Sequence, residues 1–288
     1  SVASRGLGDV YKRQVPDTLD QKLWPEIEDK IDKKEKINQE FEIQNTDRAV
    51  GTRISYHLYK KFGNNNLDEN SIELNFKGSA GQSFGAFAIK GLKLILKGDA
   101  NDYVAKGLSG GTIVIKLQDE SNLVSNENTI IGNTVLYGAT SGKLLAAGQA
   151  GERFAVRNSG ATAVVEGCDS NGCEYMTGGN IIILGDIGDN FGAGMTGGMA
   201  FIYDPENQFD KKVNPESVVW QTPETKFWIE HLRKLIQEHA IETNSTISKK
   251  IVENFENEIN NFVQVCPKEM LDKLENPISN KKLVGQAS

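Results

Sequence analysis

The stretch GLKLILKGDANDYVAKGLSGG, residues 91–111, contains one full unit of the repeat from which the fold is predicted. An apolar strand ends in glycine at Gly98, and a glycine pair follows at Gly110 and Gly111. Similar strands end at Gly78, Gly148, Gly167 and Gly185, and similar pairs stand at Gly178-Gly179 and Gly197-Gly198. Because these strand ends recur at about twenty-residue intervals, apart from one interrupted stretch, the middle of the chain is read as a repeat array.

Apolar and polar residues alternate within the first repeats. Ile72, Leu74 and Phe76 fall on one face of a strand, and Glu73 and Lys77 fall on the other. One coil cannot bury such a face alone, but stacked coils form a continuous apolar column with backbone hydrogen bonds between turns. The sequence therefore predicts a mainly β fold. We expect a single-stranded, right-handed parallel β-helix of about twenty-residue coils, with flanking α-helices at both ends.

The chain is expected to turn its corners at glycine, which enters the φ > 0 region without steric cost. Asparagine is the next best residue there, and the candidates are Asn101, Asn133, Asn158 and Asn190. Residues 71–204 contain 24 of the 29 glycines and no proline, which would delete ladder hydrogen bonds. The stretch QDESNLVSNENTI (118–130) breaks the period, so we predict a loop there.

Composition divides the chain into five parts. Residues 1–14 resemble translated adaptor sequence and are expected to be an artefactual leader. The other parts are a linker with a helix and a strand (15–50), the β-helix domain (51–204), a C-terminal helical segment (205–266) and a polar tail (267–288). In the linker, apolar residues from Leu19 to Ile31 recur every four positions and predict a helix, and EFEIQ (40–44) alternates as a strand.

Two helices are expected in residues 205–266. Thr222 and Pro223 predict the N-cap and first turn of a helix. One face of that helix carries Trp228, Leu232, Leu235, Ile236 and His239, and a second helix carries Ile247, Ile251, Phe255, Ile259 and Phe262. Both helices are expected to pack on the β-helix or on a neighbouring domain.

The charge pattern favours protein partners. The chain has 32 basic and 39 acidic residues, a net charge of −7, and no basic block, so neither nucleic acid nor a membrane surface is an expected partner. There is no run of 18 apolar residues and no apolar signal-peptide core. We therefore expect a cytoplasmic protein.

The three cysteines are too few for a disulfide framework. Cys168 and Cys173 lie close in sequence, but Cys266 and all three histidines are distant. Structural zinc normally needs four ligands, so free thiols are favoured over a metal site.

Two kinds of glycine-rich motif can be interpreted either as binding sites or as turns of the fold. GAGMTG (192–197) matches G-x-G-x-x-G, but it runs into the strand-like MAFIYD rather than a helix, so a β-helix corner is favoured over nucleotide binding. GDANDY, with Asp99, Asn101 and Asp102, and the similar GDIGDN (185–190) suggest calcium or turn-capping aspartates. We favour capping, because calcium-binding β-rolls need a nine-residue repeat.

GERFAVRNSGA (151–161) gathers charge in a zone that is otherwise poor in it. Glu152, Arg153 and Arg157 precede or flank Asn158, and arginine can grip carboxylates through two parallel hydrogen bonds. An anion clamp is one reading. An ion pair within the molecule or at a domain interface is favoured over it. No residue is predicted to be catalytic or to bind a cofactor or metal.

Long blocks of the sequence resemble one family. They are NTDRAVGTRIS (45–55), GSAGQSFGAF (78–87), GDANDYVAKGLSGG (98–111), IIGNTVLYGATSG (130–142), AGERFAVRNSGATAVVEG (150–167), GCEYMTGG (172–179) and NFGAGMTGG (190–198). In this order they resemble the GXGXG domain that closes the glutamate synthase large (alpha) subunit, and the match covers roughly residues 41–272. Ala105 stands where the family usually has glycine, and Asn171 where it usually has histidine. We expect slight strain at Ala105 and no proton-transfer role at Asn171.

The resemblance implies a part of a large oxidoreductase that converts 2-oxoglutarate and glutamine into two glutamates. It places FMN and an iron–sulfur cluster in the upstream part of the subunit, with no cofactor in this chain. The expected partners are the amidotransferase and FMN-binding domains of the same subunit, with ferredoxin or a small NADPH-oxidising subunit as electron donor. The implied role is a non-catalytic scaffold that holds those domains in register.

Two other functions stay open. One is a stand-alone β-helix subunit of a split glutamate synthase or of a formylmethanofuran dehydrogenase-like complex. The coding sequence upstream of residue 15 would distinguish this subunit from a domain of the large subunit. A start codon there would indicate the stand-alone subunit, and continuous coding sequence for an FMN domain would indicate the large subunit. The other is an extracellular carbohydrate-active β-helix, which needs paired carboxylates in a groove and would be shown by polysaccharide cleavage.

Overall fold

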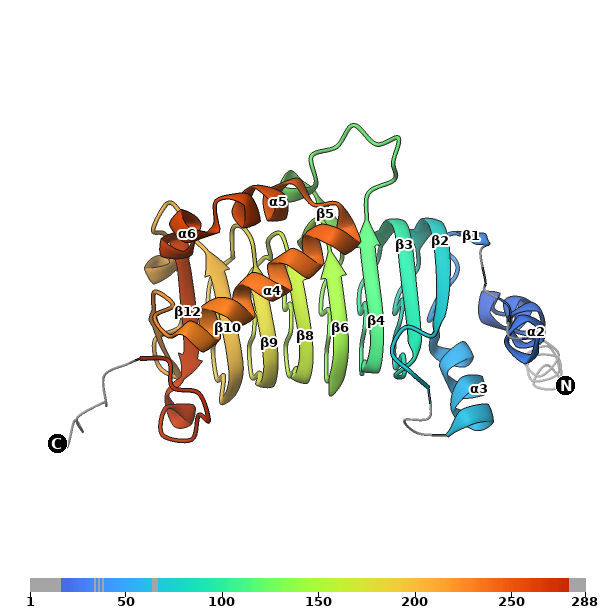
Figure 1. Ribbon diagram of the computed structural model, residues 1–288, viewed down its shortest axis with the longest axis horizontal. Helices are drawn as coiled ribbons and strands as arrows, with labels where there is room; N and C mark the ends of the chain where they lie inside the picture. Colours follow the sequence, from blue (N-terminus) through green and yellow to red (C-terminus); the bar gives the residue numbers. More distant parts are fainter. Residues whose placement is uncertain (1–16, 34, 36, 38, 64–66, 280–288) are drawn as a thin grey trace, which may run out of the picture.

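The chain forms an elongated β-solenoid with helices at its ends and along one side (Figure 1). The computed structural model describes residues 17–33, 35, 37, 39–63 and 67–279. The solenoid has about seven turns, with coils about 20 residues apart, so the predicted β-helix is confirmed. The proposed leader, residues 1–14, lies outside the described residues, as do residues 280–288 of the tail.

One side of the solenoid is a ladder of long parallel strands. These are β2 (Ile72–Ala80), β3 (Leu92–Ala100), β4 (Ser109–Lys116), β6 (Ser141–Ala146), β8 (Ser159–Val165), β9 (Thr177–Ile183) and β10 (Gly197–Tyr203). The register places Leu92 beside Ile72, twenty positions earlier, and Thr162 beside Lys143, nineteen positions earlier. The repeat length in the sequence is therefore the length of one coil.

The inward side chains of these strands form the core. One row across the coils consists of Leu74, Leu94, Ile113, Leu144, Ala163, Ile181 and Ala200, and all seven are fully buried. A one-residue slip would turn this row outward, because side chains alternate along a strand. The alternation predicted for β2 and β3 is therefore what sets the register.

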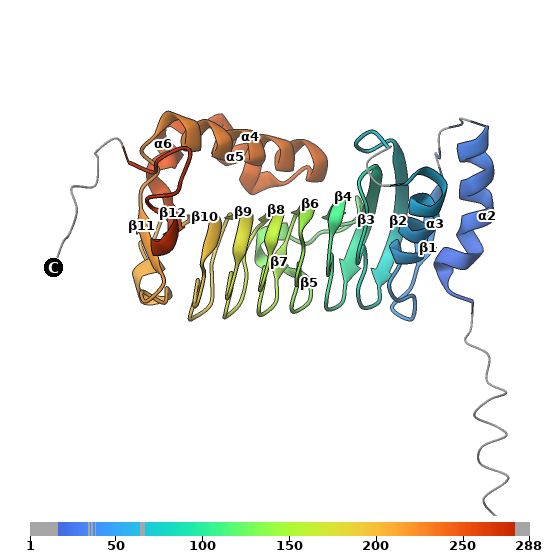
Figure 2. The same cartoon turned by 90° about the horizontal axis from the view of Figure 1, so that it is seen from below.

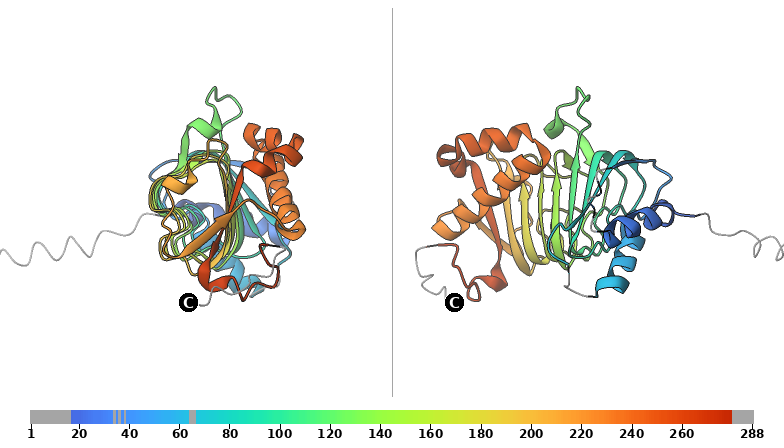
Figure 3. Two further views of the ribbon diagram at one scale, coloured as in Figure 1. Left: turned by 90° about the vertical axis from the view of Figure 1, so that its left-hand side faces the viewer. Right: turned by 45° about the vertical axis from the view of Figure 1, so that its right-hand side comes forward.

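A second apolar row points outward under the C-terminal helices. Val114, Leu145, Val164, Ile182 and Phe201 are fully buried although they lie on the outer side of the ladder. They are covered by α4 (Lys226–Thr243), α5 (Thr246–Glu253) and α6 (Phe255–Glu258), which run along one side only (Figure 2). The view down the long axis shows the coils superposed, with these helices on one face (Figure 3).

The C-terminal segment contains strands as well as helices, which corrects the predicted helical segment 205–266. After the 3₁₀ turn η2 (Phe209–Lys211) comes β11 (Val218–Gln221), and the predicted second helix ends before η3 (Ile259–Asn261) and β12 (Phe262–Pro267). β12 pairs antiparallel with β10 and with β11. Its pairing satisfies the open edge of β10, which explains why Phe262 is in a strand and not in a helix.

The predicted N-cap at Thr222 is also wrong. The helix begins at Lys226 with Thr225 as N-cap residue. Because Gln221 still belongs to β11, the chain needs residues 222–224 to turn from strand to helix. The start of the tail is packed rather than loose: η4 (Lys268–Met270) follows β12, and Ile278 is buried.

The N-terminal segment caps the other end. α2 (Leu19–Asp32) and β1 (Glu40–Ile43) confirm the predicted helix and strand, and α3 (Thr52–Phe62) follows. β1 pairs in parallel with β2, so it is the first rung of the solenoid rather than part of a linker. The buried Asp20 carboxylate of α2 accepts hydrogen bonds from the backbone N–H groups of Gly51, Arg53 and Ile54 and so caps α3.

The predicted loop at 118–130 projects from the rod (Figure 1). It contains the 3₁₀ turn η1 (Ser125–Glu127) and leads into β5 (Thr129–Ile131), which pairs with β3 and β7 (Gln149–Ala150). Lys77 and Lys97 form ion pairs with Glu120 and Asp119 at its base. Among the described helices, none is both long and apolar enough to cross a membrane.

Candidate interaction surface

One side of the solenoid is built from arcs rather than strands. We call it the arc face, and it comprises residues 83–87, 103–107, 134–138, 153–157, 171–175 and 190–194. The first, third and fifth residue of every arc has a positive φ. These residues are Ser83, Gly85, Phe87, Tyr103, Ala105, Gly107, Thr134, Leu136, Gly138, Arg153, Ala155, Arg157, Asn171, Cys173, Tyr175, Asn190, Gly192 and Gly194.

Hydrogen bonds between coils hold this backbone in place. In the arc 153–157, the N–H groups of Arg153 and Arg157 donate to the carbonyls of Ser170 and Glu174 in the next coil, at 2.9 and 3.1 Å. The N–H of Ala155 donates backwards, to a carbonyl of the preceding coil at 2.9 Å. A left-handed residue other than glycine costs about 1–2 kcal/mol. The bonds to both neighbouring coils offset that cost.

The prediction that asparagines occupy left-handed corners is wrong for three of four candidates. Asn190 has a positive φ, but Asn101, Asn133 and Asn158 do not. Asn158 instead links coils, because its amide donates to the carbonyls of Ala161 at 2.9 Å and Gly178 at 3.2 Å. Its short polar side chain therefore serves the turn by hydrogen bonding and not by backbone freedom.

The acidic and amide side chains of the other turns also bond between neighbouring coils. Asp102 Oδ1 accepts from the N–H of Asn133 at 2.8 Å, and Asn133 Oδ1 accepts from the N–H of Glu152 at 2.9 Å. Asp99 accepts from the Ser79 hydroxyl at 2.7 Å. These contacts leave Asn101 as a turn residue with no side-chain role that the structure shows.

The predicted corner glycines meet two different demands. Gly98 has φ +150°, and a Cβ there would lie 1.8 Å from the carbonyl oxygen of Gly78. In each pair, one glycine has a positive φ: Gly110, Gly179 and Gly198. Their partners Gly111, Gly178 and Gly197 lie against the neighbouring coil, as at Gly178, where a Cβ would meet a carbonyl at 2.3 Å. Close packing of coils, as much as backbone freedom, requires these glycines.

The two departures from the family pattern both lie on the arc face. Ala105 is buried with φ 57°, so it has the strained conformation that the sequence predicted. Asn171 has φ 63°, and its Oδ1 accepts a hydrogen bond from the Asn190 amide at 2.9 Å. A role in linking coils explains Asn171.

Large aromatic side chains are exposed along the arc face. Phe87 and Tyr175 are 49% and 51% exposed, and Tyr103 and Tyr137 are each 39% exposed. The ring of Phe87 lies over Gly107 and that of Tyr175 over Gly194, where a Cβ would come within 2.3 and 2.4 Å of the rings. Glycine in the next coil therefore makes room for each ring.

The two arginines of the charged cluster predicted from GERFAVRNSGA lie on this surface, and Glu152 directly precedes their arc. Glu152, Arg153 and Arg157 are exposed, and the Arg157 guanidinium lies 5.6 Å from the centre of the Tyr175 ring. Within residues 17–279 as described, neither arginine has a carboxylate within 4.0 Å. The intramolecular ion pair is therefore not formed there, and the arginine charges face solvent.

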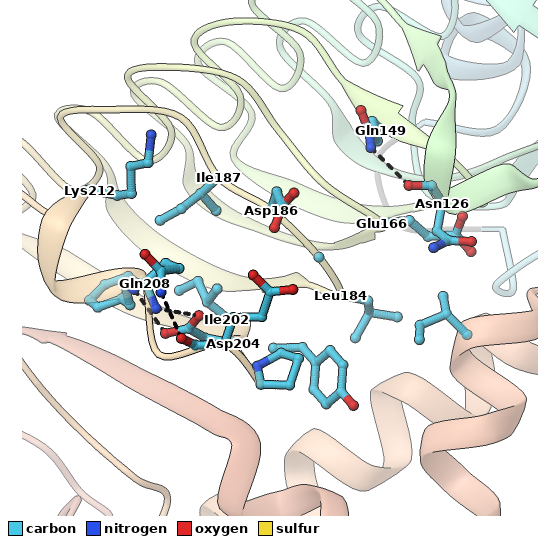
Figure 4. Close-up of a pocket in the computed structure, with 16 residues that line it drawn as sticks. Asn126, Gln149, Glu166, Leu184, Asp186, Ile187, Ile202, Asp204, Gln208 and Lys212 are labelled. Carbon is cyan, nitrogen blue, oxygen red and sulfur yellow. Dashed lines mark hydrogen bonds between the residues drawn. The ribbon is translucent and has the colours of Figure 1, made fainter.

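A pocket of about 450 Å³ lies between the coil corners and α5 (Figure 4). Asn126 and Glu166 lie at one end, Lys212 at the other, and Asp186 between them. Asp204, which also lines the pocket, caps the following turn by accepting from two backbone N–H groups at 2.9 Å. The acidic lining is therefore partly engaged in local structure.

The structure shows a buried polar network at this pocket that was not predicted from the sequence. The Ser245 hydroxyl donates to Glu166 Oε1, whereas Oε2 has no hydrogen bond within 3.5 Å. Burial raises the pKa of Glu166, although the hydroxyls of Ser245 and Ser125 oppose this. Glu166 follows the apolar run ATAVV, and that position was the only signal available in the sequence.

His239 continues the network on the inner face of α4. Its Nε2 lies 2.9 Å from the carbonyl oxygen of Ala146, which can only accept, so Nε2 carries the proton. Its Nδ1 then accepts from the Ser248 hydroxyl at 2.6 Å. Burial lowers the pKa of His239 to about 4, so the ring is neutral at pH 7. A neutral, doubly bonded imidazole joins the helices to β6.

The cysteine thiols are buried and protonated. Burial raises the pKa of Cys168 and of Cys266 to about 12, and raises that of Cys173 as well. Nucleophiles and metal ligands use the thiolate, so these environments oppose both roles. No cluster of three or more His, Cys, Asp or Glu residues able to hold a metal ion occurs in the part of the chain that the structure describes.

GAGMTG opens a strand. Gly192 and Gly194 have positive φ on the last arc, and the motif ends where β10 begins. A dinucleotide fingerprint needs a helix N-terminus at that point to meet the pyrophosphate. The motif is therefore part of the repeating arc geometry. A family model for the GXGXG motif matches residues 20–268, a range that includes all six arcs.

The chain belongs to the GXGXG family. This GXGXG chain is 53% identical to the glutamate synthase [NADPH] large chain of Azospirillum brasilense, over 95% of this chain and 18% of that protein. It is 47% identical to ferredoxin-dependent glutamate synthase 2 of a Synechocystis strain, over 87% and 16%. It is also 47% identical to glutamate synthase [NADH] of Schizosaccharomyces pombe, over 92% and 12%. The resemblance to the glutamate synthase large subunit is confirmed, and the chain spans less than a fifth of the length of these relatives.

Proposed function

We propose that this chain is the scaffold domain of a cytoplasmic glutamate synthase, which converts 2-oxoglutarate and glutamine into two glutamates. The enzyme would serve glutamate biosynthesis and ammonia assimilation. The observation that carries the proposal is the similarity of almost the whole chain to a small part of three such enzymes. In this role the solenoid holds an amidotransferase domain and an FMN domain in register.

The solenoid geometry supports a structural role. Each coil is hydrogen-bonded to both neighbouring coils through the long strands and through the arcs, so the coils form one continuous stack. The side chains best suited to chemistry are engaged in structure, since His239 is neutral and bonded at both ring nitrogens. In this role the chain contacts neighbouring domains through its shape and its exposed surface.

The cofactors of the proposed enzyme belong elsewhere in the subunit. An iron–sulfur cluster is held by cysteine thiolates, and the buried, protonated Cys168, Cys173 and Cys266 do not fit that role. We place FMN and the cluster in the upstream part of the subunit. Electrons would come from ferredoxin or a small NADPH-oxidising subunit.

A stand-alone subunit is a second candidate. The chain's own elements favour it, because β1 and α3 continue the first coil and β12 and β11 continue the last one. A solenoid with both ends covered can exist without a covalent neighbour. Such a subunit would assemble noncovalently with the catalytic parts of a split glutamate synthase.

Truncation of the intact subunit tests the scaffold role. We expect a large subunit ending before residue 15 to hydrolyse glutamine and bind FMN, but to form less glutamate per glutamine hydrolysed. Addition of the 288-residue chain in trans should restore part of that ratio. A truncated subunit with full coupling would contradict the proposal, and so would one that loses FMN while it stays folded.

A further inference from the structure

The arc face carries side chains whose backbone conformation would be easier with glycine. The fifth residue of the six arcs is glycine in three of them, at Gly107, Gly138 and Gly194. It is Phe87 in the first arc, and Arg157 and Tyr175 in two neighbouring coils. Arg157 and Tyr175 have a left-handed backbone, with φ 54° and 53°. Strained residues that are exposed add nothing to the core, so their side chains are better explained by a contact outside the chain.

Arg157 and Tyr175 form one surface with Arg153, which we call the platform. The guanidinium of Arg157 lies over the half-exposed Tyr175 ring, which in turn lies over Gly194. Arg153 is the first residue of the same arc as Arg157, and its side chain is exposed. A stacked guanidinium and aromatic ring loses little side-chain entropy on binding, which is typical of residues that dominate interfaces.

The charges of the platform favour an acidic partner. The chain as a whole carries −7, yet neither arginine is paired with a carboxylate within the described residues. Each guanidinium can hold a carboxylate through two parallel hydrogen bonds. Glu152 and Glu174 lie in the same two coils, and they would repel a polyanion such as a nucleic acid more than a single side-chain carboxylate.

We propose that the platform docks an acidic segment of another domain of the same subunit. A carboxylate of that segment binds Arg157 and Arg153, and its apolar neighbours pack on Tyr175. This inference rests on the proposed scaffold function and names the surface that performs it. The docked segment supplies the carboxylate that Arg153 and Arg157 do not have among the described residues.

Site-specific photocrosslinking in the intact large subunit tests this inference. Tyr175 is replaced by the photoreactive residue p-benzoylphenylalanine, and Ile241, which is 81% exposed on α4, is the matched control site. We expect Tyr175 to crosslink to an Asp- or Glu-containing peptide of another domain. The double charge reversal Arg153→Glu with Arg157→Glu should lower that crosslink at least tenfold, whereas Lys250→Glu on α5 should leave it unchanged.

Two further variants guard against misfolding. Arg157→Gly removes the side chain and relaxes the left-handed backbone, so it should weaken the crosslink without lowering the melting temperature. Changing the captured carboxylate to lysine should restore crosslinking in the double charge reversal.

The outcomes separate the inference from the function on which it rests. Crosslinks from Tyr175 that survive the charge reversal, or crosslinks only from position 241, overturn the platform and leave the scaffold role standing. No crosslink from either position, together with domains that separate on limited proteolysis, would overturn both.

Discussion

At the scale of single residues, the left-handed arcs are the most unusual feature of this chain. Leu136 and Ala155 are fully buried at φ 63° and 59°, in a conformation that side chains with a Cβ rarely adopt. Each N–H donates to the preceding coil at 2.9 Å. The strain is tolerated because the register of the neighbouring coils supplies an acceptor at each of these positions.

Glycine substitutions separate steric contact from backbone strain. Gly98→Ala places a Cβ against the Gly78 carbonyl, so we expect it to lower the free energy of unfolding by about 3 kcal/mol or more. Gly138→Ala is the control, since it has φ +63° but no atom within 4 Å of an added Cβ, and it should cost only about 1 kcal/mol. Urea unfolding of the 288-residue chain measures both. Equal losses would contradict the close approach of the coils.

The corner glycines were predictable from the sequence, but the left-handed side chains were not. Gly98 and the pair Gly178-Gly179 stand at turns because their spacing repeats with the coil. Arg153 and Tyr175 carry no such signal, because their strain is offset by hydrogen bonds to Ser170 and Ala193, which lie seventeen and eighteen positions further along the chain. Local propensity predicts the backbone conformation that a residue prefers. The conformation that it adopts here depends on the register of the neighbouring coils, which the sequence of one arc does not show.

At the scale of elements, the C-terminal helices depend on a few buried polar contacts. His239 joins α4 to β6, and Ser245 and Ser248 join α5 to Glu166 and to His239. Lys93 pairs with Glu242 at 2.8 Å near the end of α4. Burial opposes the charge of Lys93, but Glu242 and Glu73 outweigh it and raise its pKa.

His239 should make the chain sensitive to mild acid. Its pKa falls from an ordinary 6.5 to about 4 on folding, so between these values the unfolded chain binds the extra proton and stability falls as pH falls. The loss from this group should be about 2 kcal/mol between pH 7 and pH 5. His239→Gln keeps an amide donor toward Ala146 and should remove most of that loss, as measured by urea unfolding at both pH values.

Glu166 provides the control of opposite sign. Its pKa is raised on folding, so the folded chain binds the extra proton and stability from this group falls as pH rises above its ordinary value. Glu166→Gln should therefore make the wild-type loss between pH 7 and pH 5 steeper. The same pH dependence in wild type and His239→Gln would show that the imidazole is not held neutral.

Helices and strands were predictable where their periodicity is uninterrupted. The four-residue spacing that predicted α2 and the alternation that predicted β1 needed no knowledge of the fold. Phe262 continued a helical spacing but lies in β12, because the open edge of β10 required a partner strand. The buried network of Glu166 and His239 joins residues far apart in sequence, so no motif could show it.

At the scale of the whole molecule, the chain is a rod closed at both ends by its own elements. α2, α3 and β1 cover the first coil, and β12 and β11 pair beside β10 (Figures 1 and 2). Repetition made the rod predictable, because each coil repeats the last. The caps were only partly predictable, since a cap is defined by the edge that it covers and not by its own sequence.

The absorption spectrum and the glutaminase activity of the purified 288-residue chain test the scaffold role. We predict a folded protein that shows no absorption from bound flavin after incubation with FMN and removal of free FMN. We also predict that it releases no glutamate from glutamine. Stoichiometric flavin binding or glutamine hydrolysis by this chain would contradict a scaffold role.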